Sequence, residues 1–254
     1  MSATAARRLL ALLGVCLTLI ACSRHNARES DSALGLDAQN SPGDLYVAMA
    51  AEYYRLGQLD EAMRRAQQAI AEDNRNPRAY YMIGVIYQRI GQMPQAEASF
   101  KQAVEISPNN PDIRNAYGNF FCEQRRFSEA QAQFAKALEN PLYNTPWVAM
   151  VNAGICAASA GDRTRAQTEY RRALKANPRF GPALLKLAEL EYGRGDAKAA
   201  KDSLDRFFQA NAPTPQALEL AIATERKLGN SKGAATYEQM LRKSFPGAAA
   251  TQDR

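Results

Sequence analysis

Histidine is nearly absent from this sequence, since His25 is the only one among 254 residues. Catalysis that depends on a histidine base is therefore excluded. The chain also has no CxxC pair, no paired-histidine zinc motif, no glycine-rich phosphate loop and no nucleophile elbow. Carboxylate pairs such as Glu97 and Glu105 fall on amphipathic helices, where we interpret them as solvent-facing. We expect no enzyme, no cofactor, no metal site and no small-molecule substrate.

Long apolar runs are also missing. The longest extends from Leu9 to Ala21, directly after Arg7 and Arg8, and it is too short for a transmembrane helix, which needs about 20 residues. A basic start followed by such a run is typical of a secretory signal. Its end, Leu19-Ile20-Ala21-Cys22, resembles a bacterial lipobox, which implies that residues 1–21 are removed and Cys22 is lipidated. The alternative is an ordinary cleaved signal in which Cys22 is incidental.

The residues after Cys22 bear on where the chain resides. Residues 22–42 are polar and lack a helical apolar period, so we expect a lipidated cysteine followed by a flexible tether. Ser23 is not the aspartate that retains such lipoproteins in the inner membrane. The predicted location is the outer membrane, lipid-anchored and facing the periplasm.

The charge balance is modest. The formal net charge is +6, and it falls to about +4 once Arg7 and Arg8 leave with the signal. We interpret this excess as spread along the helices without a Lys/Arg cluster. Such a chain is soluble and weakly attracted to anionic surfaces, and we expect no nucleic-acid partner.

A 34-residue period is the main feature that is present. Gly57 matches Gly91, and Gly161 matches Gly195 and then Gly229. One supersecondary unit is therefore copied along the chain, which indicates a solenoid. We place the starts of the copies at Gly43, Pro77, Pro111, Trp147, Gly181 and Pro215. A two-residue insertion falls at residues 142–147, between the third and fourth copies.

The pattern within each copy resembles the tetratricopeptide repeat. Small residues stand where paired helices approach, namely Gly84, Gly118, Gly154 and Ala188 on the first helix and Ala96, Ala130, Ala166 and Ala200 on the second. Glycines occupy the turns, prolines end the second helices, and Phe100, Phe134 and Tyr170 fill the space between helices. The predicted fold is all-α, a right-handed superhelical solenoid of six repeats and about twelve antiparallel helices over residues 43–248, with residues 249–254 as a disordered tail. Glu191 and Glu225 replace the usual aromatic, which we interpret as the polar outer face of terminal repeats.

Two cysteines remain in the mature fold, Cys122 and Cys156. An even pair in an oxidising compartment favours a disulfide. Their spacing of 34 residues places them on corresponding helices of adjacent repeats, so the sulfurs can meet. The alternative is two buried free thiols that act as small apolar residues.

Tetratricopeptide arrays typically hold a peptide or a helix on the first helix of each repeat. In this register the partner-binding positions are Tyr54, Tyr81, Val85, Gln88, Arg89, Asn115 and Asn119. Aromatic, aliphatic and amide side chains together suit a groove that grips a backbone and buries a few side chains. Asn115 and Asn119 lie one turn apart and are the strongest candidates.

Local segments resemble one family more closely. NAYGNFFCEQRRFSEA (115–130), ENPLYNTPWVAMVNAGIC (139–156) and LRKSFPGA (241–248) are similar to the type IV pilus biogenesis lipoproteins known as pilotins, of the PilF/PilW kind. The resemblance implies a monomeric assembly factor, anchored in the outer membrane by its lipid, that binds secretin subunits and promotes their multimerisation. The alternatives are a repeat lipoprotein that serves barrel assembly or recruits peptidoglycan hydrolases, and an enzyme with an unrecognised domain, for which the repeats leave no room.

Overall fold

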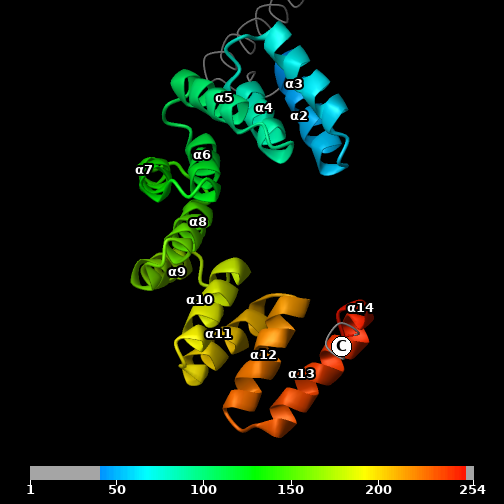
Figure 1. Cartoon of the computed structure of the whole chain (residues 1–254), viewed down its shortest axis with the longest axis vertical. Coiled ribbons are helices and arrows are strands. Elements are labelled where there is room, and N and C mark those ends of the chain that lie inside the picture. Colours follow the sequence, from blue (N-terminus) through cyan, green and yellow to red (C-terminus); the bar gives the residue numbers. More distant parts are fainter. Residues whose placement is uncertain (1–40, 250–254) are drawn as a thin grey trace, which may run out of the picture. The chain divides into compact units, whose positions relative to one another are not determined.

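The computed structural model describes residues 41–249, which form helices and no strand (Figure 1). The helices are α2 (Pro42–Arg55), α3 (Leu59–Glu72), α4 (Pro77–Arg89), α5 (Met93–Ile106), α6 (Pro111–Glu123), α7 (Phe127–Leu138), α8 (Pro146–Ser159), α9 (Arg163–Ala176), α10 (Gly181–Gly193), α11 (Ala197–Ala210), α12 (Pro215–Lys227), α13 (Ser231–Ser244) and α14 (Pro246–Ala249). No helix in this range is long and apolar enough to cross a bilayer. The predicted signal, Cys22 and most of the tether lie outside the described residues, as does the tail from residue 250.

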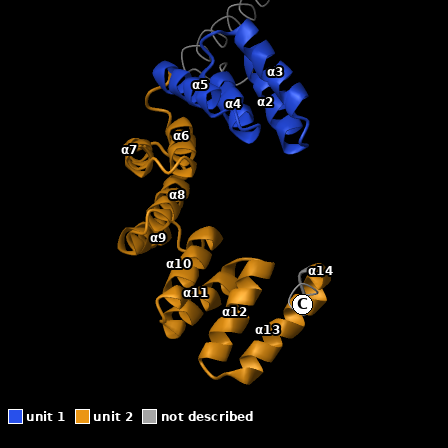
Figure 2. Cartoon of the chain, viewed as in Figure 1, with its two compact units in different colours: residues 1–106 blue, residues 107–254 orange. Residues whose placement is uncertain are grey.

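The chain divides into two compact units (Figure 2). In the described part of the first unit, residues 41–106, α2 pairs with α3 and α4 with α5. Asparagine and serine caps define the helix starts, because their side-chain oxygens accept the unpaired backbone N–H groups of the first turn. Asn76 Oδ1 accepts from the N–H groups of Arg78 and Ala79, and Ser41 Oγ accepts from that of Asp44. The first helix therefore begins at Pro42, a residue that the sequence analysis places in the tether.

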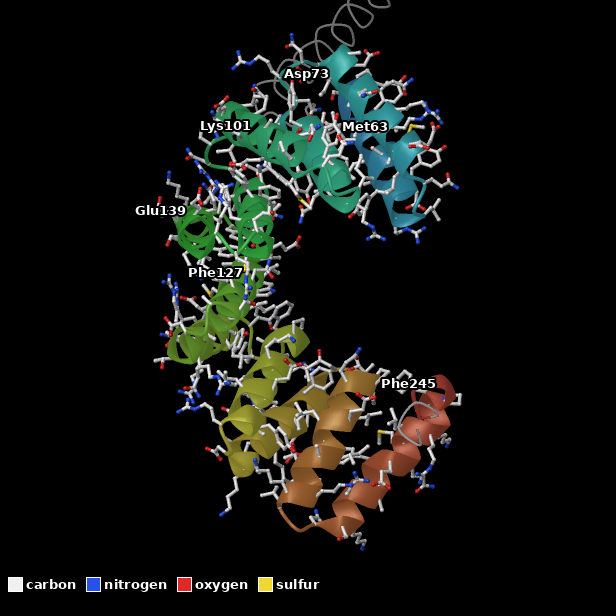
Figure 3. The ribbon with its side chains drawn as sticks, viewed as in Figure 1. Met63, Asp73, Lys101, Phe127, Glu139 and Phe245 are labelled. Carbon is white, nitrogen blue, oxygen red and sulfur yellow. A yellow bond between two sulfur atoms is a disulfide. The ribbon has the colours of Figure 1, made fainter. Side chains whose placement is uncertain are left out.

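In the second unit, from residue 107 onward, four helix pairs follow one another, α6 with α7 through α12 with α13. The first helices also contact one another, α6 with α8, α8 with α10 and α10 with α12. They form a continuous row, and each second helix packs against it, which is the arrangement expected of a helix-pair solenoid. At its end, Phe245 packs against the cluster that contains Leu218, Ile222 and Leu241 (Figure 3).

The close approach of paired helices rests on glycine, as predicted. A Cβ atom on Gly154 would lie 2.5 Å from the Tyr170 ring, and one on Gly118 would lie 2.6 Å from the Phe134 ring. Both rings are almost fully buried. The first helix therefore contacts the aromatic of the second directly, and a larger residue would push the two axes apart.

The turns within the pairs use a left-handed residue to end the first helix. Gly57, Gly91, Gly161, Gly195 and Gly229 all have φ between 75° and 89°. The third pair is different, because Arg125 occupies this position with φ 59°. A side chain at positive φ costs roughly 1–2 kcal/mol through contact of its Cβ with the backbone. The sequence pattern contains no glycine here, and the backbone adopts the same turn.

Replacing Arg125 with glycine is therefore expected to stabilise the second unit by about 1 kcal/mol. Arg125 is exposed, so the change removes little packing. Urea unfolding followed by circular dichroism measures the shift. Gly91→Ala is the converse control, since it places a Cβ at φ 80° and should lower the midpoint. An unchanged midpoint for Arg125→Gly would mean that the turn carries no strain.

Glu191 and Glu225 do not form a polar outer face, and that interpretation was wrong. Their exposed fractions are 6% and 3%. Ser203 Oγ donates to Glu191 Oε2 at 2.8 Å, while Lys201 Nζ and Asn230 Nδ2 donate to Glu225 at 2.8 and 2.7 Å. Each glutamate is buried at the repeat position of the usual aromatic, because hydrogen bonds from neighbouring polar side chains offset the cost of burying it.

The protein shifts the pKa values of these two carboxylates in opposite directions. Burial raises the pKa of Glu191, and the hydrogen bond from Ser203 only partly opposes it. Burial acts in the same sense on Glu225, but the hydrogen bonds from Lys201 and Asn230 outweigh it and hold that pKa below its usual value. Ionised Glu225 therefore stabilises the fold above the unfolded-state pKa of about 4.3, and ionised Glu191 destabilises it there.

We therefore expect the stability changes caused by replacing Glu225 and Glu191 to have opposite signs at neutral pH. Glu225→Gln should lower stability at pH 7 by about 1 kcal/mol, and the loss should disappear as the pH falls through the folded pKa of Glu225. Glu191→Gln should raise stability at pH 7, and the gain should vanish as the pH falls toward about 4. Urea midpoints of both variants and the wild type, measured in steps from pH 7 down to about pH 3, test this. Parallel pH dependences of the two variants would contradict it.

Charge is not evenly spread along the helices, contrary to the sequence interpretation. The α9 segment carries Arg163, Arg165, Arg171, Arg172 and Lys175 against a single acid, Glu169. Helical spacing gathers most of these cations on one side, because residues three, four and seven positions apart share a face.

Candidate partner-binding surface

The predicted binding residues fall in both units, and each group is described within its own unit. Tyr54 lies at the end of α2, while Tyr81, Val85, Gln88 and Arg89 lie on α4. Tyr54 and Val85 pack against a buried cluster formed by α2, α3 and α4, which leaves each side chain partly exposed. The structure thus brings these two residues to the same part of the first unit.

Aromatic contacts hold the remaining members of this group. The Arg89 guanidinium lies 5.9 Å from the centre of the Tyr54 ring, and the Tyr81 ring lies 6.3 Å from that of Phe100 at a tilted angle. Cation–π and tilted aromatic pairs of this kind contribute about 0.5–1.5 kcal/mol each. Tyr81 and Gln88 are half-buried and Arg89 is exposed. The first-unit group therefore presents aromatic, amide and guanidinium groups held by packing.

In the second unit, Asn115 and Asn119 lie one turn apart on α6, and both are half-buried. Asn152 Nδ2 on α8 donates to Asn115 Oδ1 at 3.0 Å, which leaves the Asn115 amide group as a donor. The Asn119 side chain has no hydrogen-bond partner among the described residues. A half-buried amide with an unused donor and acceptor is suited to a peptide backbone, which needs one of each.

Two residues of this surface were missed by the sequence analysis, Asn152 and Ile155. The insertion shifts the register between the third and fourth pairs to 36 residues, so Ile155 on α8 corresponds to Asn119 on α6. Ile155 is 37% exposed, and it is one of five large apolar side chains in the described chain that are exposed. The 36-residue offset was the signal that would have found it. The surface therefore combines amide groups with an exposed aliphatic residue.

A disulfide joins Cys122 on α6 to Cys156 on α8, with a Cα–Cα distance of 5.6 Å. Cys122 follows Asn119 by three residues and Cys156 directly follows Ile155. The cross-link thus fixes α6 against α8 beside the amide pair. Because of the two-residue insertion, Cys156 does not occupy the same repeat position as Cys122, although both lie on first helices.

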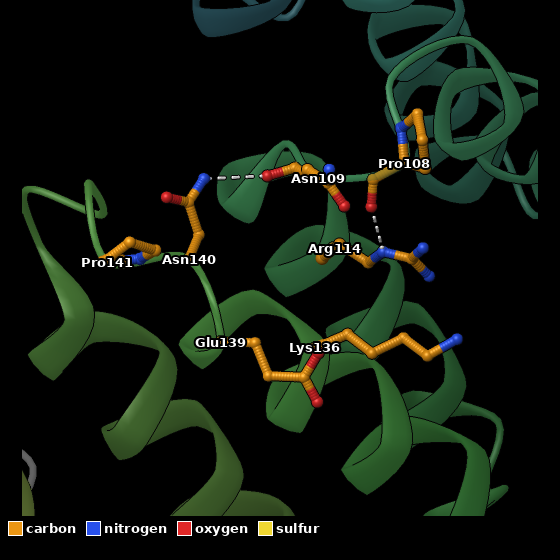
Figure 4. Close-up of a pocket in the computed structure, with 7 residues that line it drawn as sticks. All are labelled: Pro108, Asn109, Arg114, Lys136, Glu139, Asn140 and Pro141. Atoms are coloured by element: carbon orange, nitrogen blue, oxygen red, sulfur yellow. Dashed lines mark hydrogen bonds between the residues drawn. The ribbon is translucent and has the colours of Figure 1, made fainter.

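A separate depression of about 550 Å³ lies near the start of α6 and the end of α7 and is lined in part by Arg114 (Figure 4). Arg114 is 9% exposed, and it donates to Pro108 O at 2.8 Å and to Gln133 Oε1 at 2.7 Å. Burial lowers the pKa of its guanidinium, and Glu139 opposes that effect. None of the predicted binding residues lines this depression. Within residues 41–249, no cluster of histidine, cysteine and carboxylate residues is suited to a metal ion.

Comparison with protein families now defines the class. Two tetratricopeptide-repeat profiles match the chain, one over residues 47–111 and 151–206 and the other over residues 91–141. With the paired helices and the row of first helices, these matches make it a tetratricopeptide-repeat protein, a scaffold fold of protein–protein interaction. A search of curated proteins finds no match.

Comparison with solved structures shows which family of tetratricopeptide-repeat proteins the chain resembles. The crystal structure of PilW, a widely conserved type IV pilus biogenesis factor, is 31% identical, with a TM-score of 0.73 and coverage of 84% of this chain and 98% of that one. The chain belongs to this family of type IV pilus biogenesis factors. Pseudomonas aeruginosa PilF is 22% identical, with a TM-score of 0.71 and coverage of 85% and 98%. A tetratricopeptide-repeat protein from Parabacteroides merdae, 17% identical, shares the fold at a TM-score of 0.60 and coverage of 86% of each chain.

Proposed function

We propose that this protein is a pilotin, an outer-membrane lipoprotein that binds secretin subunits and promotes their localisation and multimerisation during type IV pilus biogenesis. Membership of the PilW family supports the pathway. The observation that carries the binding role is the surface on α6 and α8. Asn119 has no hydrogen-bond partner among the described residues, Ile155 at the corresponding position of α8 is exposed, and a disulfide joins the two helices close by in sequence.

The binding step follows from the chemistry of that surface. Asn119 offers a donor and an acceptor to a partner backbone, while Ile155 offers apolar area for one of its side chains. The cross-link holds α6 and α8 at a set spacing, so little ordering is required when the partner binds. In the first unit, Tyr54, Tyr81, Val85, Gln88 and Arg89 offer a second set of contacts.

The anchoring step depends on Cys22, which we propose carries the lipid. A chain held at a membrane concentrates the subunits that it binds, and raised effective concentration promotes their assembly without new contacts between them. Proteins with a single acyl chain bind membranes only marginally, whereas two or more chains anchor stably. Retention at the outer membrane is thus part of the proposed mechanism.

The first experiment examines secretin in a strain that lacks this gene, by probing outer-membrane fractions for heat- and detergent-resistant multimers. We expect monomer to persist, multimers to be lost, and the wild-type gene to restore them. Cys22→Ala should mislocalise the protein and fail to restore multimers. Normal multimers in the deletion strain would overturn the proposal and indicate another envelope assembly pathway.

Point variants test the binding surface itself. Asn119→Lys and Tyr81→Glu are each expected to weaken secretin capture by about tenfold or more, because a charge replaces a group that contacts the partner. Gln209→Lys on α11 is the matched control for Asn119→Lys, since it also replaces an amide with a lysine, at an exposed position on a second helix. Thermal unfolding checks that the arrays stay folded. Unchanged capture by a folded Asn119→Lys variant would place binding elsewhere.

A further inference from the structure

The second helix of the fourth pair, α9, has one face with cations and no acid. Its members are Thr164, Arg165, Thr168, Arg171, Arg172 and Lys175, all exposed, and we name them the basic face. Spacings of four, seven and eleven residues bring them to one side of the helix. Figure 3 shows nitrogen-tipped side chains projecting from this part of the ribbon.

The repeats provide an internal comparison for this face. The corresponding positions on α7 and its C-cap are Ser128, Glu129, Ala132, Ala135, Lys136 and Glu139. Those on α11 are Lys198, Ala199, Asp202, Asp205, Arg206 and Gln209. On both neighbouring helices acids offset the cations. The fold therefore does not require four cations at these positions. The corresponding face of α13 also lacks an acid, but it carries only two cations, Lys232 and Lys243.

Two of the four cations of the basic face have a carboxylate partner. Arg172 Nη1 lies 2.8 Å from Glu169 Oε2, and Arg171 Nη2 lies 4.0 Å from Glu191 Oε1. Arg165 and Lys175 have no carboxylate partner in the described part of the chain. A depression of about 410 Å³ beside the face is lined by three cations, Arg171, Lys175 and Arg206, and by two acids, Glu191 and Asp202. The basic face thus keeps a net positive charge that is exposed to solvent.

We propose that the basic face docks on anionic phospholipid headgroups of the membrane to which the protein is anchored, and this inference rests on the proposed lipidation of Cys22. Exposed cations near such a surface are attracted to it, and their contributions add along the face. Ser41 follows Cys22 by only 19 positions, a reach of at most about 65 Å. The anchor therefore keeps the bilayer near the fold, and a weak attraction becomes effective because it is intramolecular.

A membrane fits this face better than an acidic protein does. Specific protein interfaces have an apolar or aromatic centre, whereas the basic face offers only guanidinium, ammonium and threonine groups. None of the exposed large apolar residues of the described chain lies on α9. Fluid, laterally mobile headgroups need no shape complementarity and respond to charge alone.

The test uses the lipidated protein, isolated from membranes and reconstituted on vesicles of phosphatidylethanolamine, with or without phosphatidylglycerol as the anionic lipid. The readout is the rate at which an amine-reactive reagent modifies Lys175, measured by mass spectrometry, with exposed Lys101 and Lys232 as internal references. Anionic vesicles should slow the modification of Lys175 at least about fivefold relative to those references, and added salt should abolish the effect.

A matched pair of variants sharpens the test. Arg165→Gln with Arg171→Gln keeps Lys175 as the reporter and should restore its reactivity on anionic vesicles. Arg242→Gln with Lys243→Gln changes the charge equally on α13, leaves the reference lysines in place and should leave the protection of Lys175 intact. Equal reactivity of Lys175 on both vesicle types would overturn the inference, as would loss of secretin capture in the α9 variant without any lipid-dependent protection. Failure of the protein to float with either vesicle type would instead refute the anchor.

Discussion

Removing the disulfide is expected to lower the stability of the second unit by about 3–4 kcal/mol, the effect of opening a loop between residues 34 positions apart. The variant is Cys122→Ala with Cys156→Ala, which keeps small apolar groups at both positions. The loss arises because the cross-link restricts the unfolded chain and because α6 and α8 then depend on packing and on the Asn115–Asn152 hydrogen bond. Urea unfolding of oxidised wild type and variant measures it.

Reduction provides the control for this experiment. A thiol reductant should lower the urea midpoint of the wild type to that of the double-alanine variant and leave the variant unchanged. Alkylation without reductant should add no alkyl group at Cys122 or Cys156. The addition of two groups would show free thiols and contradict the disulfide. The Asn115–Asn152 hydrogen bond spans the same two helices, so secretin capture should weaken along with stability.

Tyr143→Ala is expected to cost about 3–5 kcal/mol, the range for truncating a buried aromatic residue. Tyr143 belongs to the inserted segment and is 8% exposed. Its ring packs with Ala137 and Ala149, which come from the helices on either side of the insertion. Burial, reinforced by the Asp112 carboxylate, raises its pKa to about 12, so the ring stays neutral at neutral pH. Without the ring, α7 and α8 face a cavity.

Tyr143→Phe is the matched control, because it keeps the ring and removes only the hydroxyl group. Its stability should stay within about 1 kcal/mol of the wild type. Leu142→Ala, at the 83% exposed neighbour, should also be nearly neutral. Urea midpoints of the three variants distinguish an anchoring ring from a loop that merely spans the gap. Equal midpoints for Tyr143→Ala and Leu142→Ala would contradict the anchoring role.

Helix starts and turns were predictable because they depend on residues close in sequence. Pro77, Pro111 and Pro215 begin helices at the predicted positions, since a proline at the first helical position loses no hydrogen bond. The turn at Arg125 was harder, because its backbone follows the fold although the residue disfavours that conformation. The turn there has the same backbone hydrogen bonds as the glycine turns, including the one from Arg126 N–H to Phe121 O.

The binding surface was only partly predictable. Asn115 and Asn119 followed from the repeat register, but the hydrogen bond from Asn152 and the exposure of Ile155 depend on how α8 packs against α6. A two-residue insertion changes which side chains meet across that contact. Pattern alone does not determine this, because the pairing of two helices depends on volumes contributed by both.

The amino-acid sequence by itself determined the repeat, the all-helical class and the family, because glycine, proline and small residues act within one helix pair and recur at a constant spacing. The tertiary structure decided which polar groups are buried and which remain available. Glu191 and Glu225 are buried because Ser203, Lys201 and Asn230 reach them from other helices or turns. Arg165 and Lys175 stay unpaired because no carboxylate of the described chain lies opposite them. Such outcomes depend on contacts between distant residues, and only the packed chain establishes those contacts.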